Sequence, residues 1–91
     1  MDTEILLAPV KLALRIKSEA FDEDIEDLIR ACKKDLQVAG VKKIQDDDPL
    51  IKRAVVLYCK GNFGDNDNAV RYMQSYESLK ISLCLAGDYL A

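Results

Sequence analysis

Apolar residues recur along the chain at helical spacing, and no segment alternates apolar and polar residues over a convincing length. The clearest stripe recurs at steps of three, four and seven residues. It consists of Ile25, Leu28, Ile29, Cys32, Leu36 and Ala39. The whole pattern predicts an all-α fold, a compact array of about four helices joined by short loops, in one domain over residues 1–91. We expect a short helix over 8–16 and longer helices over 22–39, 49–60 and 68–85.

Local signals at the ends of these segments predict where the helices begin and end. Asp22 and Asp48 can each act as an N-cap, accepting hydrogen bonds from N–H groups of the first turn. Pro49 suits the first helical position, and Pro9 suits the first turn of its helix, because the missing N–H costs nothing there. Gly40 is typical of the residue that follows a helix.

The predicted helix over residues 49–60 is apolar on nearly all sides. One face carries Leu50, Ile51, Ala54, Val55 and Tyr58, and Val56, Leu57 and Cys59 widen it. A helix of this kind is central in its domain or is buried by a neighbouring subunit. Because a short chain has little with which to surround one helix, the pattern indicates oligomerisation.

Composition and charge exclude several classes of function. The chain has 91 residues, 13 Lys and Arg against 16 Asp and Glu, a net charge of -3 and no His. Because sequence-independent nucleic-acid binding depends on Lys and Arg at phosphates, an acidic chain is a poor candidate for it. The lack of His excludes His-dependent catalysis and His-ligated metals. We expect no membrane span, since no run reaches about 18 apolar residues, and no secretory signal.

Three cysteines lie far apart among apolar residues, at Cys32, Cys59 and Cys84. No pair has the spacing of a zinc or redox motif. We therefore predict buried, reduced side chains that pack as small apolar groups. The alternative, a reactive thiol or an intermolecular disulfide, lacks the basic neighbours that activate a thiol.

Acidic residues gather over 22–27, 46–48 and 65–67, and none of these runs has the spacing of a metal site. Consecutive carboxylates diverge, and the alternating ligands with a distal Glu that define a calcium loop are incomplete. Helix N-termini and turns explain these residues. With no Gly-rich phosphate loop and no nucleophile motif, we expect no enzyme, metal or cofactor.

Charge differs between two neighbouring segments. Residues 21–40 carry three basic and six acidic side chains, whereas residues 41–60 carry five basic and three acidic ones. Ordinary mixed surface charge is one explanation, and unlike faces for head-to-tail self-association are the other. Candidate residues for an acidic channel or subunit face are Glu23, Asp24, Glu26, Asp27, Asp46 and Asp47.

Other candidate interface residues are apolar residues near the chain ends, exposed cations and tyrosines. They are Leu6, Leu7, Lys42, Lys43, Lys52, Arg53, Tyr72, Tyr89 and Leu90. Tyr89 is the strongest tyrosine candidate, because it lies beyond the last predicted helix in a tail that we expect to be flexible. At least one of Tyr72 and Tyr76 is expected in the core, since both lie on the stripe of the last helix.

The order of these features resembles the small head–tail connector proteins of tailed phages and prophages, also called adaptor or head-completion proteins. The resemblance rests on Val10-Lys11-Leu12-Ala13-Leu14-Arg15-Ile16, the acidic opening Asp22-Glu23-Asp24-Ile25-Glu26-Asp27-Leu28-Ile29, and Pro49-Leu50-Ile51-Lys52-Arg53-Ala54-Val55 followed by Tyr58. Residues 69–80 resemble the versions found in phages and prophages of Gram-positive bacteria.

The resemblance implies a structural role without catalysis or cofactor. Members are similar all-α domains that assemble as a ring of about 12 subunits with closed symmetry. The ring docks below the phage portal protein, extends the DNA channel, and joins head to tail by offering a platform for the next connector or tail-completion protein. DNA would pass through without specific binding. The protein would lie at the head–tail junction of the virion, and in the host cytoplasm during assembly.

Two other classes of function remain open. A helix-turn-helix regulator needs a basic recognition helix, and the last two predicted helices offer few cations. Those cations are Lys52, Arg53, Lys60, Arg71 and Lys80. A small helical protein-binding domain, such as an antitoxin-like adaptor, would bind one partner through an apolar groove. A salt-sensitive gel shift would favour the first class, and a discrete heterodimer the second.

Overall fold

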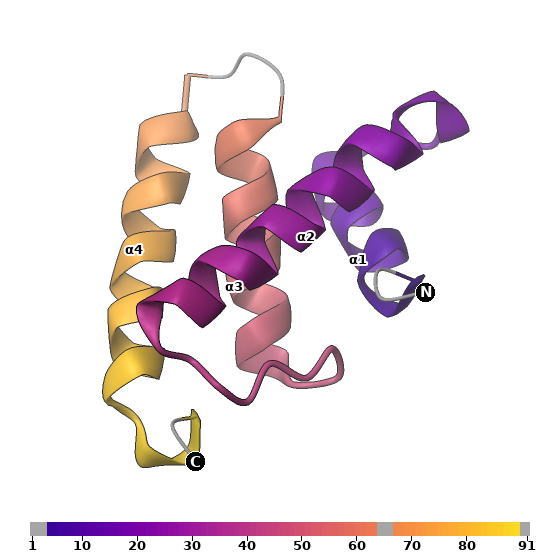
Figure 1. Cartoon of the computed structure of the whole chain (residues 1–91). Coiled ribbons are helices and arrows are strands. Elements are labelled where there is room, and N and C mark those ends of the chain that lie inside the picture. The colour runs from indigo at the N-terminus through magenta and orange to yellow at the C-terminus, as the bar shows by residue number, and fades with distance from the viewer. Residues whose placement is uncertain (1–3, 64–66, 90–91) are drawn as a thin grey trace.

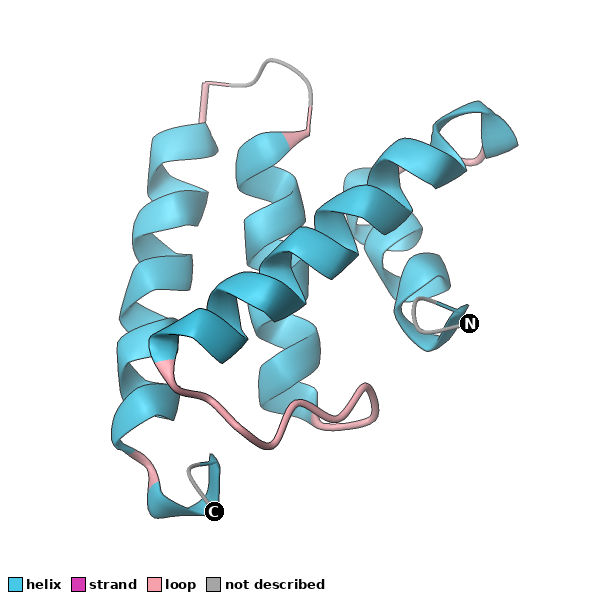
Figure 2. Ribbon diagram, in the orientation of Figure 1, coloured by secondary structure: helices cyan, strands magenta, loops and turns pink. Residues whose placement is uncertain are grey.

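The computed structural model describes residues 4–63 and 67–89, and within them it contains four α-helices and two 3-10 turns. The elements are α1 Glu4–Leu14, η1 Glu19–Phe21, α2 Asp22–Ala39, α3 Pro49–Asn62, α4 Ala69–Leu85 and η2 Gly87–Tyr89. No residue in the described ranges forms a strand (Figure 2). The predicted all-α fold is therefore confirmed.

Helix α3 lies at the centre of the fold. Figure 1 shows α3 beside α4, with α2 crossing both and α1 next to the N-terminal half of α2, and α3 contacts each of the other helices. Its buried residues are Ile51, Ala54, Val55, Val56, Leu57 and Cys59. The apolar character of α3 is thus explained within one subunit, and the inference from it to oligomerisation does not hold.

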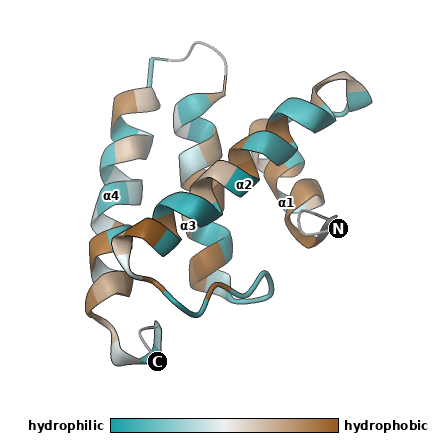
Figure 3. Ribbon diagram, in the orientation of Figure 1, coloured by the Kyte–Doolittle hydropathy of each residue, from teal (hydrophilic) through white to brown (hydrophobic). Residues whose placement is uncertain are grey.

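Helix α1 begins four residues before the predicted start, so Pro9 lies inside the helix and not in its first turn. A proline there removes one backbone hydrogen bond. Leu6 and Val10, one helical turn apart, are fully buried in the core. Their burial offsets the cost of Pro9, and Figure 3 shows how much of α1 is hydrophobic.

Helices α1 and α2 end with the same backbone motif. The residue after each helix has a positive φ, 59° at Arg15 and 111° at Gly40. The next residue, Ile16 or Val41, donates its N–H to a carbonyl of the last helical turn at 3.0 Å. This is the Schellman arrangement, which satisfies terminal carbonyls. Gly40 confirms the sequence prediction, whereas Arg15 adopts a conformation that its side chain disfavours.

The two predicted N-caps behave differently. Asp48 caps α3 as expected, accepting from the Leu50 N–H at 2.8 Å, and Pro49 takes the first position. Asp22 is instead the first residue of α2, because the turn η1 leads directly into that helix. Its carboxylate lies 2.6 Å from the Lys11 ammonium, so it pairs α1 with α2. The prediction of Asp22 as a cap is therefore wrong.

Helix α3 continues through Gly61 to Asn62, two residues further than predicted. A Cβ at Gly61 would lie 2.5 Å from the Met73 Sδ of α4. The glycine therefore allows α3 and α4 to approach closely, and it does not end the helix.

A part-buried polar contact connects α4 to α2. The Tyr76 hydroxyl, on a fully buried side chain, donates to Asp35 Oδ2 at 2.6 Å. Lys80 Nζ donates to the same oxygen at 3.0 Å. The hydrogen bond from Tyr76, followed by the hydrogen bond and the charge of Lys80, holds the pKa of Asp35 below its ordinary value. The Tyr58 ring packs edge-on against the Tyr76 ring, with the ring centres 5.2 Å apart. The full burial of Tyr76 confirms the expectation that at least one of Tyr72 and Tyr76 is in the core.

The turn η2 folds back onto the loop between α2 and α3. The Tyr89 hydroxyl donates to Asp48 Oδ2 at 2.7 Å, and the Tyr89 carbonyl accepts from the N–H groups of Lys42 at 2.6 Å and Lys43 at 3.2 Å. The expectation of a flexible tail is therefore wrong at Tyr89, because three hydrogen bonds attach it. Leu90 lies outside the described residues.

Candidate subunit-interface surfaces

The predicted acidic residues of α2 lie at its N-terminal end, which projects from the rest of the subunit (Figure 1). Glu23, Asp24 and Asp27 are exposed, and Glu26 is half-buried. Arg30 lies 3.0 Å from Asp27 and 3.8 Å from Glu26. Carboxylates at this end are favoured by the helix dipole, and most of their surface stays accessible to a partner.

Asp46 and Asp47 form a separate acidic patch in the loop before α3. Asp47 is exposed, whereas Asp46 is half-buried and lies 2.6 Å from Lys33 Nζ. Lys33 follows Glu23 by ten residues, or about 15 Å along α2. The structure therefore does not bring the six predicted acidic residues onto one face.

The predicted basic residues also form two groups, one in the loop after α2 and one at the start of α3. Lys42, Lys43, Lys52 and Arg53 are all exposed. Across 4–63 and 67–89, none of these four side chains has an ion-pair partner. Unpaired exposed cations are available to an acidic partner surface.

The other predicted interface residues fall mostly inside the subunit. Leu6 has no exposed surface, so its assignment to an interface is wrong. Leu7 and Tyr72 are half-buried against the core, and Lys60 Nζ lies 5.0 Å from the Tyr72 ring centre. Tyr89 uses its hydroxyl and its carbonyl within the subunit. A short chain needs the apolar residues near its ends for its own core, and for this reason these residues are poor candidates for an interface.

An open groove lies between the N-terminal half of α2 and the end of α3, and we call it the acid-rimmed groove. It is lined by Phe21, Leu28, Ala31, Asn62 and Phe63, together with the exposed side chains of Asp24 and Asp27. The rings of Phe21 and Phe63 pack edge-on at 5.6 Å. The two aspartates were predicted from the sequence, whereas the apolar lining was not. Phe21 and Phe63 are 42 residues apart in the chain, and only the fold brings them together.

A second apolar surface lies between α1 and the first turns of α3, and we call it the basic-flanked surface. Its residues are Pro9, Leu12, Ala13, Pro49, Lys52, Arg53 and Val56. Leu12 is 80% exposed there. Lys52 and Arg53 are among the interface residues predicted from the sequence, and Leu12 is not. The sequence signal was present, since Leu12 lies off the face that carries Val10, Ala13 and Leu14.

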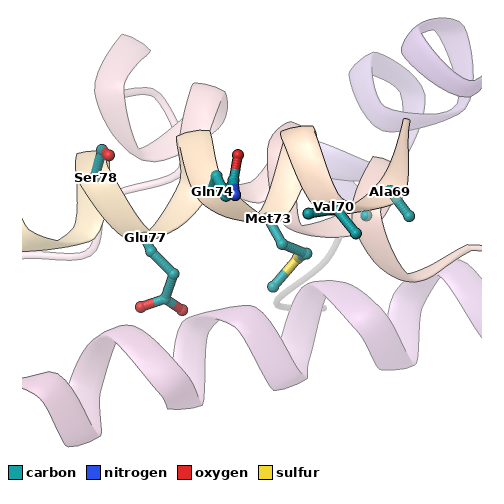
Figure 4. A pocket seen from close by; sticks show the side chains of 7 residues that line it. Ala69, Val70, Met73, Gln74, Glu77 and Ser78 are labelled. Atoms are coloured by element: carbon teal, nitrogen blue, oxygen red, sulfur yellow. The ribbon is translucent and has the colours of Figure 1, made fainter. Parts of the chain in front are cut away.

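A third groove follows α4 beside the close contact at Gly61. Figure 4 shows Met73 and Glu77 projecting from one side of α4, with Gln74 and Ser78 on another. Glu77 lies 3.0 Å from Lys80 Nζ, so its charge is paired within the helix. The groove is mostly apolar and has no strongly charged edge.

The described ranges contain no metal-binding cluster, and two of the three thiols are buried. No three or more Cys, Asp or Glu side chains converge there on a point that could hold a metal ion, and Asp65 lies outside those ranges. Burial raises the pKa of Cys32 and of Cys59 to about 12. Cys84 is half-buried, and its thiol lies 3.3 Å from the Ala39 carbonyl.

Comparison with known proteins assigns the chain to a family. Across 4–63 and 67–89, every helix is too short or too polar to cross a membrane. Neither the curated proteins nor the solved structures gave a match to the chain. A family model described as phage connector protein matches residues 6–90. The chain, a compact all-α fold, therefore belongs to the phage connector family of structural proteins.

Proposed function

We propose that the chain is one subunit of a ring that docks below the phage portal protein, extends the DNA channel and joins head to tail. The observation that carries the proposal is the family match over residues 6–90. It is supported by two apolar surfaces of unlike charge on one small subunit. In this proposal the partners are further copies of the chain, the portal protein, and the next connector or tail-completion protein.

The surface charge suits a component through which DNA passes without being held. The chain has a net charge of -3, and Glu23 and Asp47 are exposed. Carboxylates that face a channel would repel phosphate and prevent DNA from adhering to the wall. We assign the protein to the head–tail junction of the virion, and to the host cytoplasm before assembly.

The central position of α3 argues against a helix-turn-helix regulator. A recognition helix must present one long face to the major groove. Helix α3 contacts α1, α2 and α4, which leaves it no long free face. Its exposed cations Lys52 and Arg53 both lie near its start. A gel shift that is sensitive to salt would restore that alternative.

Light scattering coupled to size-exclusion chromatography tests the proposal. We expect the mass to rise towards a closed species as the protein is taken from micromolar to near-millimolar concentration. Where the free chain stays monomeric, pull-down with phage portal protein tests the same proposal, because a ring can assemble on its template. Failure to self-associate together with failure to bind portal protein would refute the connector function.

A further inference from the structure

We propose that neighbouring subunits meet head to tail, with the basic-flanked surface of one copy seated in the acid-rimmed groove of the next. The inference rests on the proposed ring and adds the residues that form its subunit contact. It pairs Leu12, Lys52 and Arg53 of one copy with the groove and its rim residues, Asp24 and Asp27, of another.

The basic-flanked surface has the character of an inserting element. Leu12 is 80% exposed, and Pro9 and Val56 lie in the same shallow apolar site. Such a leucine exposes apolar area that water penalises, and burial against another chain would remove that cost. The neighbouring Lys52 and Arg53 side chains have no ion-pair partner across 4–63 and 67–89.

The acid-rimmed groove has the matching character of a receptor. Its volume is about 740 Å³, and Phe21, Leu28 and Phe63 give it an apolar floor. Phe21 is 44% exposed, so part of that floor faces solvent in the single subunit. The exposed side chains of Asp24 and Asp27 also line it, where they can attract cations that flank an inserted apolar side chain.

The positions of the two surfaces allow one copy to use both at once. The basic-flanked surface is at the start of α3, at Pro49, Lys52 and Arg53, whereas the groove is at its end, at Asn62 and Phe63. Ten residues of helix separate Lys52 from Asn62, or about 15 Å. Two different surfaces on one subunit generate a head-to-tail contact. Repeated contacts close into a ring when the rotation between neighbouring copies divides a full turn evenly.

Charge selects this pair among the apolar surfaces of the subunit. The groove beside Gly61 and Met73 offers one charged group, Glu77, and Lys80 pairs with it. The acid-rimmed groove offers two, Asp27, which pairs with Arg30, and Asp24, which has no ion-pair partner across 4–63 and 67–89. The acid-rimmed groove and the basic-flanked surface are complementary in both apolar character and charge.

Disulfide trapping tests the contact even when the association is weak. In a Cys84→Ser background, the double variant Leu12→Cys with Ala31→Cys should give a ladder of cross-linked multimers on mild oxidation. A mixture of the two single variants should stop at dimers, because each chain then carries one half of the contact. The control pair Val38→Cys with Val70→Cys uses two other exposed positions. A double variant that cross-links no better than this control would overturn the contact.

Charge reversal gives a second, independent test. Asp24→Lys with Asp27→Lys, and separately Lys52→Glu with Arg53→Glu, should each raise the concentration needed for assembly at least about tenfold, as like charges then meet. An equimolar mixture of the two variants should regain assembly, since every contact again joins unlike charges. Circular dichroism checks that each variant is folded.

The two proposals fail in different ways. Assembly that persists unchanged in both charge-reversed variants would refute this contact and leave the ring intact. A wild-type chain that neither self-associates nor binds portal protein, and whose Leu12→Cys with Ala31→Cys variant matches the control pair, would refute both.

Discussion

Two tyrosines attach the C-terminal part of the chain to earlier residues, each through an aspartate 41 positions before it. Tyr76 donates to Asp35 at 2.6 Å, and Tyr89 donates to Asp48 at 2.7 Å. The two bonds are nearly equal in length and in chain separation. Their surroundings differ, because Tyr76 is fully buried between helices whereas Tyr89 is half-buried at the edge of the subunit.

The comparison teaches that burial, more than bond length, decides what such a hydrogen bond contributes. Around Tyr76 lie the Tyr58 ring, the Cys32 thiol at 3.8 Å from the hydroxyl, and Lys80 on the same carboxylate. A group left unpaired there would pay the full cost of lost hydration. Around Tyr89, water can replace the lost partner. We call the contact of Tyr76 with Asp35 the inner contact and that of Tyr89 with Asp48 the outer contact. We therefore expect the inner contact to stabilise the whole fold and the outer contact to fix the position of η2.

The largest expected difference concerns the thiols beside the two contacts. Cys32 lies at Tyr76, whereas Cys84 precedes η2 and is half-buried. Because burial raises the pKa of Cys32 and Cys59 from 9.0 to about 12, their thiolate fraction falls about a thousandfold. An aromatic disulfide reagent should thus label Cys84 first in the folded protein. Equal labelling rates of all three cysteines would show that the region around the inner contact opens readily.

Removal of the inner hydroxyl should cost stability. Tyr76→Phe should lower the free energy of unfolding by about 1.5 kcal/mol, near the lower end for a bond to a charged acceptor, because Lys80 still pairs with Asp35. Urea unfolding measures the loss. Tyr72→Phe, one helical turn away and half-buried, is the matched control. A loss no larger than the control's would contradict the role given to Tyr76.

Acid should weaken the inner contact. The folded-state pKa of Asp35 is lowered, first by its hydrogen bond from Tyr76, so its stabilisation is complete above the unfolded pKa of about 3.9. The stabilisation is lost as the pH falls through the lowered folded value. Asp35→Asn should therefore reduce the slope of stability against pH below the unfolded pKa of about 3.9. Asp47→Asn, at an exposed side chain, is the control, and an equal change of slope in both variants would contradict the role given to Asp35.

The smallest effect is expected at the outer contact. Tyr89→Phe removes one hydrogen bond to Asp48, whose other oxygen still caps α3 through Leu50. The unfolding midpoint should move less than in Tyr76→Phe. Amide hydrogen exchange should rise at Lys42 and Lys43, whose N–H groups are held by the Tyr89 carbonyl. Unchanged exchange at both amides would show that the hydroxyl does not position η2.

Local chemistry explains the parts of the structure that the sequence predicted. The cap at Asp48, the proline after it and the end of α2 at Gly40 each depend on groups within a few residues, so they follow from residue type. The same is true of the stripes on α2 and α4, because helical periodicity is a property of the segment itself. The family resemblance came from the order of these local features.

The tertiary structure alone decided how these segments share their surfaces. It placed α3 inside the subunit, moved Leu6 into the core and attached Tyr89 to a loop 41 residues earlier. It also joined Phe21 and Phe63 into one groove beside acids that the sequence had already marked. Such contacts join residues far apart in the chain, and their free energy depends on which apolar faces find each other. Spacing along a single helix does not contain that information.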